Sequence, residues 1–193
     1  MKKYIFILAL MTSYQVALAQ GIFTLQYNTG FGVGDQNDYV ESPSFRGMTF
    51  IDARFYVADY VTVGGAISWN IFYEDEFGTF NKDNTTINGA QYRYINSFPL
   101  LITVYKYWGD NDEITYYAGG GIGAYSIEQK TTMGLWEVVD DNWHFGLAPE
   151  VGVIFPLSNH AGFVINAKYN NAFKSGDSIN FGYFGINVGF AWF

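Results

Sequence analysis

The chain has 193 residues, no cysteine, ten lysines and arginines and 18 acidic residues, which give it a formal net charge of −8 at pH 7. Disulfides and thiol chemistry are therefore excluded. Nucleic acid is excluded as a partner as well, because an acidic chain without a basic cluster is poorly able to neutralise phosphates. A chain of this length is expected to form one domain.

The first 19 residues have the layout of a secretory signal peptide. Residues 1–3 include two lysines, residues 4–11 are apolar, and Ala17-Leu18-Ala19 is a cleavage site of the small-x-small type. This segment is too short and wrongly flanked for a membrane helix. We expect cleavage after Ala19, which divides the chain into a signal peptide, 1–19, and a mature domain, 20–193. No later run is long and apolar enough to predict a transmembrane helix.

The mature chain alternates between large apolar residues and small or polar ones, which is the pattern of β-strands. The alternation is clearest over 61–73, where Ile67 and Trp69 hold odd positions and Ser68 holds an even one. Phe72 is the only large apolar residue on the even face of this segment. In chain order, strands are predicted at 23–31, 47–57, 61–73, 91–107, 114–127, 143–155, 161–169 and 181–193.

The connections between these strands alternate in length, starting with a long one. Polar loops are predicted at 32–45, 74–90, 128–142 and 170–180. The other three connections between successive strands are predicted to be tight turns. Barrels of the outer membrane place short turns in the periplasm and long loops outside the cell. A soluble barrel with an apolar lumen would not need this asymmetry. The sequence therefore predicts an all-β, eight-stranded, antiparallel up-and-down transmembrane barrel whose apolar face lies in lipid.

Charged residues within the predicted strands all lie on the small, polar face. They are Asp52, Arg54, Arg93, Glu150 and Lys168. If this face lines the lumen, opposite charges can pair across it, as buried charges must. The same residues could line a narrow polar path, but an eight-stranded barrel is just wide enough to be filled by its own side chains. We expect an ion-pair network in the barrel interior, with glycines leaving room for some internal water.

Four segments carry a family resemblance: Pro99-Leu-Leu-Ile-Thr-Val-Tyr105, Tyr117-Ala-Gly-Gly-Gly-Ile-Gly-Ala-Tyr125, Pro149-Glu-Val-Gly-Val-Ile-Phe-Pro156 and Val188-Gly-Phe-Ala-Trp-Phe193. With the signal peptide, they resemble the small eight-stranded outer-membrane barrels of the OmpA/OmpX type, a porin-like family of the Gram-negative cell envelope. The resemblance spans the mature chain. It implies an integral, monomeric protein of the cell outer membrane that contacts outer-membrane lipid and lipopolysaccharide.

The same resemblance implies an assembly signal at the end of the chain. The final strand of such barrels is read by the barrel-assembly machinery, which favours a terminal phenylalanine. In this sequence the matching residues are Phe190, Trp192 and Phe193. Two successive aromatic residues, Trp192 and Phe193, depart from the strictly alternating form of that signal.

No constellation typical of catalysis stands out. The lipid A deacylases, one barrel family, use a His and a Ser two residues apart near the outer leaflet, whereas the position two residues after His144 is glycine. Ser158 and His160 have this spacing in reverse order, at a predicted periplasmic turn. Acidic loop segments could bind divalent cations, which prefer oxygen ligands, but their spacing matches no calcium loop. We expect no enzymatic activity, no cofactor and no metal.

Aromatic residues near the strand ends predict two girdles at the membrane interfaces. Tyr105 and Tyr107 are assigned to the periplasmic girdle, and Tyr73, Tyr92 and Tyr94 to the outer one. The expected role of both girdles is to anchor the barrel.

The favoured function is a structural or surface-interaction role, with outer loops presented on a rigid barrel. A narrow pore for water or small ions is the first alternative, because the lumen face is polar. A lipid A-modifying barrel enzyme is the second. The sequence identifies neither a ligand nor a partner of the loops.

Overall fold

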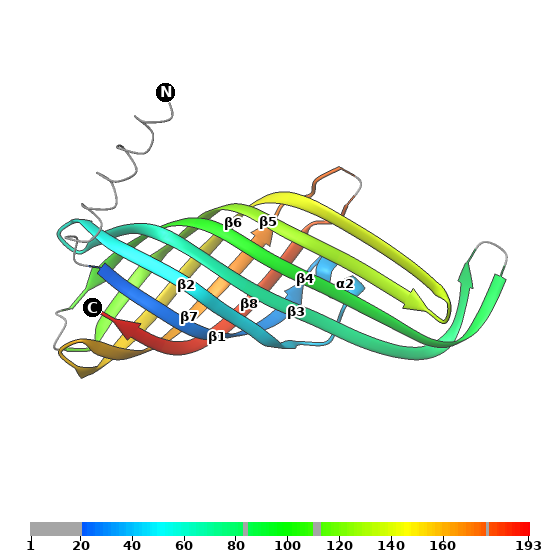
Figure 1. Cartoon of the computed structure of the whole chain (residues 1–193), viewed down its shortest axis with the longest axis horizontal. Helices are drawn as coiled ribbons and strands as arrows, with labels where there is room; N and C mark the ends of the chain where they lie inside the picture. Colours follow the sequence, from blue (N-terminus) through cyan, green and yellow to red (C-terminus); the bar gives the residue numbers. More distant parts are fainter. Residues whose placement is uncertain (1–20, 83–84, 110–112, 177) are drawn as a thin grey trace, which may run out of the picture.

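The computed structural model describes residues 21–82, 85–109, 113–176 and 178–193 (Figure 1). Within them the chain forms β1 (Gly21–Val33), α2 (Asp35–Tyr39), β2 (Ser44–Ala58), β3 (Val61–Lys82), β4 (Thr85–Trp108), β5 (Thr115–Met133), β6 (Trp136–Ser158), β7 (Ala161–Ala172) and β8 (Phe181–Trp192). The expected signal peptide, residues 1–19, lies outside the described residues. No helix in the described ranges is long and apolar enough to cross a membrane.

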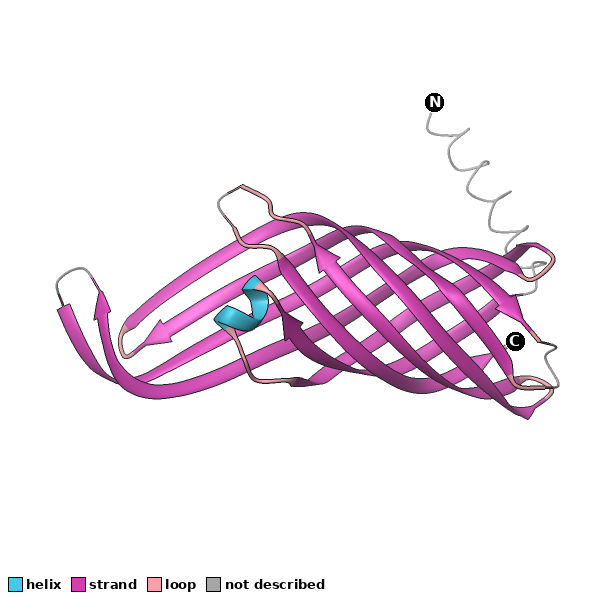
Figure 2. Ribbon diagram, turned by 180° about the vertical axis from the view of Figure 1, so that it is seen from behind, coloured by secondary structure: helices cyan, strands magenta, loops and turns pink. Residues whose placement is uncertain are grey.

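The strands close into a barrel in simple chain order. Each strand pairs antiparallel with the next, and β1 pairs with β8, so that Phe23 lies opposite Trp192 and Asn28 opposite Asn187. Closure gives the backbone groups of every strand in the barrel wall a partner on both sides. The predicted eight-stranded, antiparallel up-and-down barrel is confirmed (Figure 2).

The two ends of the barrel differ strongly. The short β2–β3 and β6–β7 turns lie at one end, together with the start of β1 and the end of β8; we call this the turn end (Figure 1). Tyr60, in the β2–β3 turn, has a positive φ of 60°. At the opposite, loop end, the β1–β2 connection folds into the short helix α2, and Val40 just after it is fully buried. The β1–β2 connection therefore covers part of the barrel mouth.

Two hairpins extend far beyond the rest of the barrel at the loop end. Loops were predicted at 74–90 and 128–142, but most of these residues continue β3 to β6, with Glu76 opposite Gln91 and Lys130 opposite Val139. The prediction was wrong because these segments are polar on both faces and lack the alternation that marks a half-buried strand. We call the described residues 73–82, 85–95, 128–133 and 136–142 the projection (Figure 2).

The barrel wall is apolar outside and polar inside. Large apolar side chains of the wall are exposed on the exterior, including Leu25, Val63, Ile102, Ile122, Val151, Ile186 and Phe190. Polar side chains of alternate residues point inward and are buried, among them Thr24, Gln26, Thr49, Ser68, Asn166 and Asn187. In β2 a register shift puts Phe50 and Ile51 outside in succession, which lets both Thr49 and Asp52 point inward.

Two apolar layers enclose a polar one inside the barrel. The layer near the turn end contains Ile22, Tyr105, Tyr107, Tyr117, Ile154, Val164 and Ala191. The layer near the loop end contains Val40, Phe72, Ile95, Leu101, Tyr125, Ile127, Ala148, Ala172, Phe181 and Tyr183. Tyr105 and Tyr107 were assigned to a lipid-facing girdle, and this was wrong because they share the inward parity of Thr103 on the same strand.

Aromatic rings occupy the space that inward-facing glycines leave. A Cβ atom at Gly152 would overlap the ring of Tyr117, and one at Gly30 would overlap the ring of Phe72. At Gly152 a ring therefore fills the space that the sequence had suggested for internal water. Phe72, the exception in the alternation of β3, thus has its place over a glycine and packs against Tyr183 at a ring distance of 5.1 Å.

The contact between Gly152 and Tyr117 gives a stability prediction. Gly152→Ala should lower the free energy of unfolding by about 1–3 kcal/mol, the usual cost of overpacking. The matched control is Gly65→Ala, because a Cβ there would meet only the Leu101 carbonyl oxygen, at 3.6 Å. Denaturant titration of the refolded proteins measures both values. Equal effects of the two substitutions would contradict the described packing.

Candidate functional site

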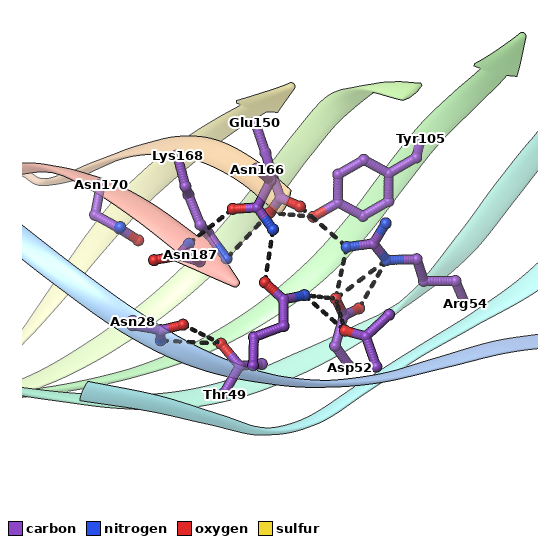
Figure 3. A network of polar contacts seen from close by, with 12 residues as sticks. Asn28, Thr49, Asp52, Arg54, Tyr105, Glu150, Asn166, Lys168, Asn170 and Asn187 are labelled. Atoms are coloured by element: carbon purple, nitrogen blue, oxygen red, sulfur yellow. Dashed lines mark hydrogen bonds and ion pairs between the residues drawn. The ribbon is translucent and has the colours of Figure 1, made fainter. Parts of the chain in front are cut away.

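A buried arginine lies at the centre of the polar layer. Arg54, on β2, is fully buried, and its Nη2 lies 2.6 Å from Asp52 Oδ2 and 3.0 Å from Glu150 Oε1 (Figure 3). Its Nε also donates to Asp52 Oδ1, at 2.9 Å. Asp52 comes from the same strand, whereas Glu150 reaches across from β6. One guanidinium therefore joins carboxylates from two sides of the lumen.

Glu150 has three partners besides Arg54. Lys168 Nζ on β7 lies 3.5 Å from its Oε2, and the hydroxyls of Tyr105 and Tyr117 each donate to it at 2.9 Å. The guanidinium of Arg54 also lies over the Tyr105 ring, 3.8 Å from its centroid. The cluster thus combines two positive and two negative groups, and two tyrosine hydroxyls donate to Glu150. Buried charges are stable only in such compensated surroundings.

Uncharged polar side chains continue the network toward β7 and β8. Thr24 donates to Asp52 at 3.0 Å, and Gln26 donates to Thr24 at 2.7 Å. Asn166 in turn donates to Gln26 at 2.6 Å, and Asn187 donates to Asn166 at 2.8 Å (Figure 3). This chain of hydrogen bonds connects four neighbouring strands, β7, β8, β1 and β2. Its arrangement suits a packed interior, because its members bond to one another rather than point into a free space.

Arg93 does not join this cluster, which corrects the expected grouping. It lies at the loop end, where its Nη2 is 3.3 Å from Glu76 Oε2 and its Nη1 donates to the Tyr39 carbonyl oxygen at 3.3 Å. Tyr39 belongs to α2, and its hydroxyl lies 2.5 Å from Thr131 Oγ1 on β5. Arg93 therefore fastens the β1–β2 connection to the projection. Arg93 occupies an inward-facing position of its strand, as the cluster residues do, but it lies nearer the loop end along the barrel axis.

His144 contacts a serine that sequence spacing did not reveal. Its Nδ1 lies 2.9 Å from the Phe173 carbonyl oxygen, and its Nε2 lies 3.5 Å from Ser178 Oγ. Ser178 is 34 residues away in the chain, so only the pairing of strands brings the two together. Both side chains are buried inside the loop end and do not face the exterior wall. Their contacts fasten the β7–β8 connection.

The remaining sequence-derived sites lie apart from this cluster. Phe190 and Trp192 point to the exterior, whereas Phe193 packs against the apolar layer at the turn end. Ser158 and His160 are exposed at the β6–β7 turn. In the described ranges, no three His, Asp or Glu side chains lie close enough together to hold a metal ion. The role of the last three aromatics in assembly stays a prediction.

Comparison with known proteins gives structural matches only. No protein-family model matches the chain, and no curated protein sequence matches it. Neisserial surface protein A is similar in structure, with a TM-score of 0.58 and 11% identity over 89% of this chain and 96% of the other. The outer membrane protein OprG from Pseudomonas aeruginosa has a TM-score of 0.52 and 14% identity over 90% and 95% of the two chains.

The chain has the fold of the small eight-stranded outer-membrane barrels. At these identities the likeness concerns the fold alone. The cluster around Arg54 and the projection are therefore interpreted from the contacts of this chain.

Substitution of Arg54 and of Arg93 should have unequal effects on the free energy of unfolding. Arg54→Met should lower the free energy of unfolding by about 3–5 kcal/mol, because it leaves Asp52 and Glu150 buried with Lys168 as their remaining cation. Arg93→Met removes a partly exposed ion pair and should cost about 0–1 kcal/mol. Denaturant titration in detergent or lipid compares the two. A loss at Arg54 no larger than that at Arg93 would show that the cluster does not stabilise the barrel.

Proposed function

We propose that this protein is an integral, non-enzymatic protein of the outer membrane of Gram-negative cells, with a surface-interaction role. Its fold is that of outer-membrane barrels, and its wall carries large apolar side chains on the exterior with polar ones inside. Soluble monomers rarely expose contiguous apolar patches beyond about 300–600 Å². An apolar wall around the whole barrel fits lipid instead. Export by a cleaved signal peptide remains part of the proposal.

The projection is the observation that carries the functional proposal. It consists of four paired strands whose outer edges have no neighbouring strand, since β2 pairs with β3 only as far as Ile71 and β6 pairs with β7 only from Gly146. Leu135 and Trp136 at the tip of the β5–β6 hairpin are exposed. Free edges and exposed faces on a rigid support suit contact with other molecules.

The filled interior favours this role over a pore. Arg54, Tyr105 and Tyr117 are buried with almost no accessible surface, and rings and ion pairs occupy successive layers between the two ends. An eight-stranded barrel filled in this way leaves no wide aqueous path. We therefore expect no stepwise conductance in planar bilayers.

Lipid modification is disfavoured by where the candidate base lies. An enzyme acting on membrane lipid needs its base and nucleophile at the exterior wall, whereas His144 and Ser178 are buried inside the loop end. The partners that we propose are lipid and lipopolysaccharide around the wall, and the barrel-assembly machinery during biogenesis. A closed wall without unpaired strands in the barrel itself is consistent with a monomer.

The absence of native cysteine allows a direct test of orientation and exposure. Leu135→Cys, at the tip of the β5–β6 hairpin, should react with a membrane-impermeant maleimide on intact cells. Asp59→Cys, at an exposed position of the turn end, should react only after the outer membrane is opened. The turn end faces the periplasm in the proposed orientation. Labelling of Asp59→Cys on intact cells, or protection of Leu135→Cys, would overturn the proposal.

A further inference from the structure

The outward face of the projection contains a pocket that the functions above leave unexplained. Its volume is about 440 Å³, and it lies over β4, β5 and β6. Its lining combines aromatic, charged and amide side chains: Tyr92, Tyr94, Asn96, Glu128, Lys130, Thr132 and Glu137. Pockets that bind small molecules combine flat apolar surface with a few polar groups in this way.

The order of residues along the strands places this pocket beyond the lipid-facing wall. Going outward along β4, the exterior positions are Phe98, Asn96, Tyr94 and Tyr92, and along β6 Asp141 follows Trp143. Charged groups on a lipid-facing surface are costly within the hydrocarbon, so the polar positions mark its end. Tyr94 lies about 13 Å further along the strand than Phe98. In the proposed orientation Tyr92 and Tyr94, which were expected in the outer aromatic girdle, stand at its outer side, above the hydrocarbon.

Tyr73, Tyr92 and Tyr94 form a group of adjacent rings, which we call the platform. The ring of Tyr73 on β3 lies 4.7 Å from that of Tyr94, at an interplanar angle of 42°, and 6.4 Å from that of Tyr92, at an angle of 14°. Tyr94 is opposite Lys130 on β5, and Tyr92 is opposite Thr132. The rings therefore border directly on the polar side of the pocket.

The polar side of the pocket is held by an ion pair. Lys130 Nζ lies 2.8 Å from Glu137 Oε1, across the β5–β6 hairpin. The hydrogen bond to Glu137 raises the pKa of Lys130 above its ordinary value, which favours the charged ammonium group. Glu128, two residues earlier, lines the same pocket with Asn96. Acceptors and donors are thus grouped beside the aromatic platform.

We infer that this pocket binds a pyranose sugar. The C–H groups on one face of a sugar carry partial positive charge and suit the negative face of an aromatic ring. Its hydroxyl groups both donate and accept, which matches carboxylates, an ammonium group and an amide at the edge of the platform. The inference deepens the proposed function, on which it rests, because it requires the projection to lie outside the hydrocarbon.

The charges on this face select a neutral sugar over an anionic one. In the described part of this face, Glu128 and Glu137 line the pocket, Asp75 lies opposite Tyr92 in the strand pairing, and Asp141 lies opposite Glu128. The amino group of Lys130 is engaged by Glu137, and the guanidinium of Arg46 lies 6.0 Å from the ring of Tyr73, which does not line the pocket. A phosphate or sulfate group on the sugar would meet a net negative surface.

The test uses the full mature barrel in phospholipid nanodiscs and soluble sugar probes. Saturation-transfer NMR with maltotriose, lactose and N,N′-diacetylchitobiose should show binding of at least one probe, and glucose 6-phosphate should not bind. Tyr94→Ala should weaken that binding by about tenfold, and Tyr94→Phe should leave it nearly unchanged, because the ring is what stacks. Glu128→Gln, which keeps the platform, should also weaken binding.

The matched control is Tyr116→Ala, which removes an exposed tyrosine at the turn end. It should leave binding unchanged. Adding lipopolysaccharide to the nanodiscs separates two sources of the sugar: loss of probe binding identifies the core sugars of the same membrane, and retained binding identifies a glycan from outside.

Two results would overturn the inference. One is that none of the three neutral probes binds; the other is that Tyr94→Ala and Tyr116→Ala bind equally well. If surface labelling of Leu135→Cys succeeds alongside either result, the sugar site fails while the proposed surface role stands. Circular dichroism of each variant checks that the barrel has formed. Tyr94→Phe keeps the aromatic ring and Glu128→Gln keeps the size of the side chain, so both test the site without a large change in packing.

Discussion

Arg54 is a fully buried cation, and the layout of the lumen depends on how its charge is compensated. Asp52 lies two residues away on β2, but Glu150 belongs to β6 and needs Lys168 on β7 as its own second cation. The tyrosine hydroxyls of β4 and β5 complete the set. A buried charge without its partners is strongly destabilising. Closure of the barrel and compensation of the charge of Arg54 are therefore coupled. The cluster joins side chains of β2, β4, β5, β6 and β7 across the lumen.

The projection continues strands that also surround the filled lumen. Inside the barrel, aromatic rings pack over glycines and the ion-pair cluster fills the lumen. The backbone pairing of β3 to β6 continues from there beyond the barrel. Beyond the barrel the same alternation sends one set of side chains toward the mouth, where Arg93 holds the β1–β2 connection, and the other set outward, where the tyrosine platform lies. A single strand such as β4 thus contributes side chains to the lumen, to the barrel mouth and to the exposed surface.

The fold was largely predictable from sequence, because parity along a strand decides which face a residue occupies. Parity alone placed Asp52 and Glu150 in the lumen, and it should have placed Tyr105 there in preference to its aromatic character. Parity does not decide height, which depends on the stagger between strands, so Arg93 was grouped with residues that lie far below it. The projection was missed because most of its residues are polar on both faces, so the alternation that marks a half-buried strand is lacking. Ser178 meets His144 only through pairing across 34 residues, which no local pattern encodes.

In the proposed membrane location, the apolar exterior of this barrel lies in hydrocarbon and the polar face is sealed inside. Ile67→Arg tests it most directly, because Ile67 is on the exterior of β3 and its neighbour Ser68 points into the lumen. The free energy of unfolding from a lipid bilayer should fall by about 2–4 kcal/mol for Ile67→Arg, the cost of arginine near the bilayer midplane. Ser68→Ala should change it little. Equal effects of the two substitutions would contradict the facing of the wall and, with it, the membrane location.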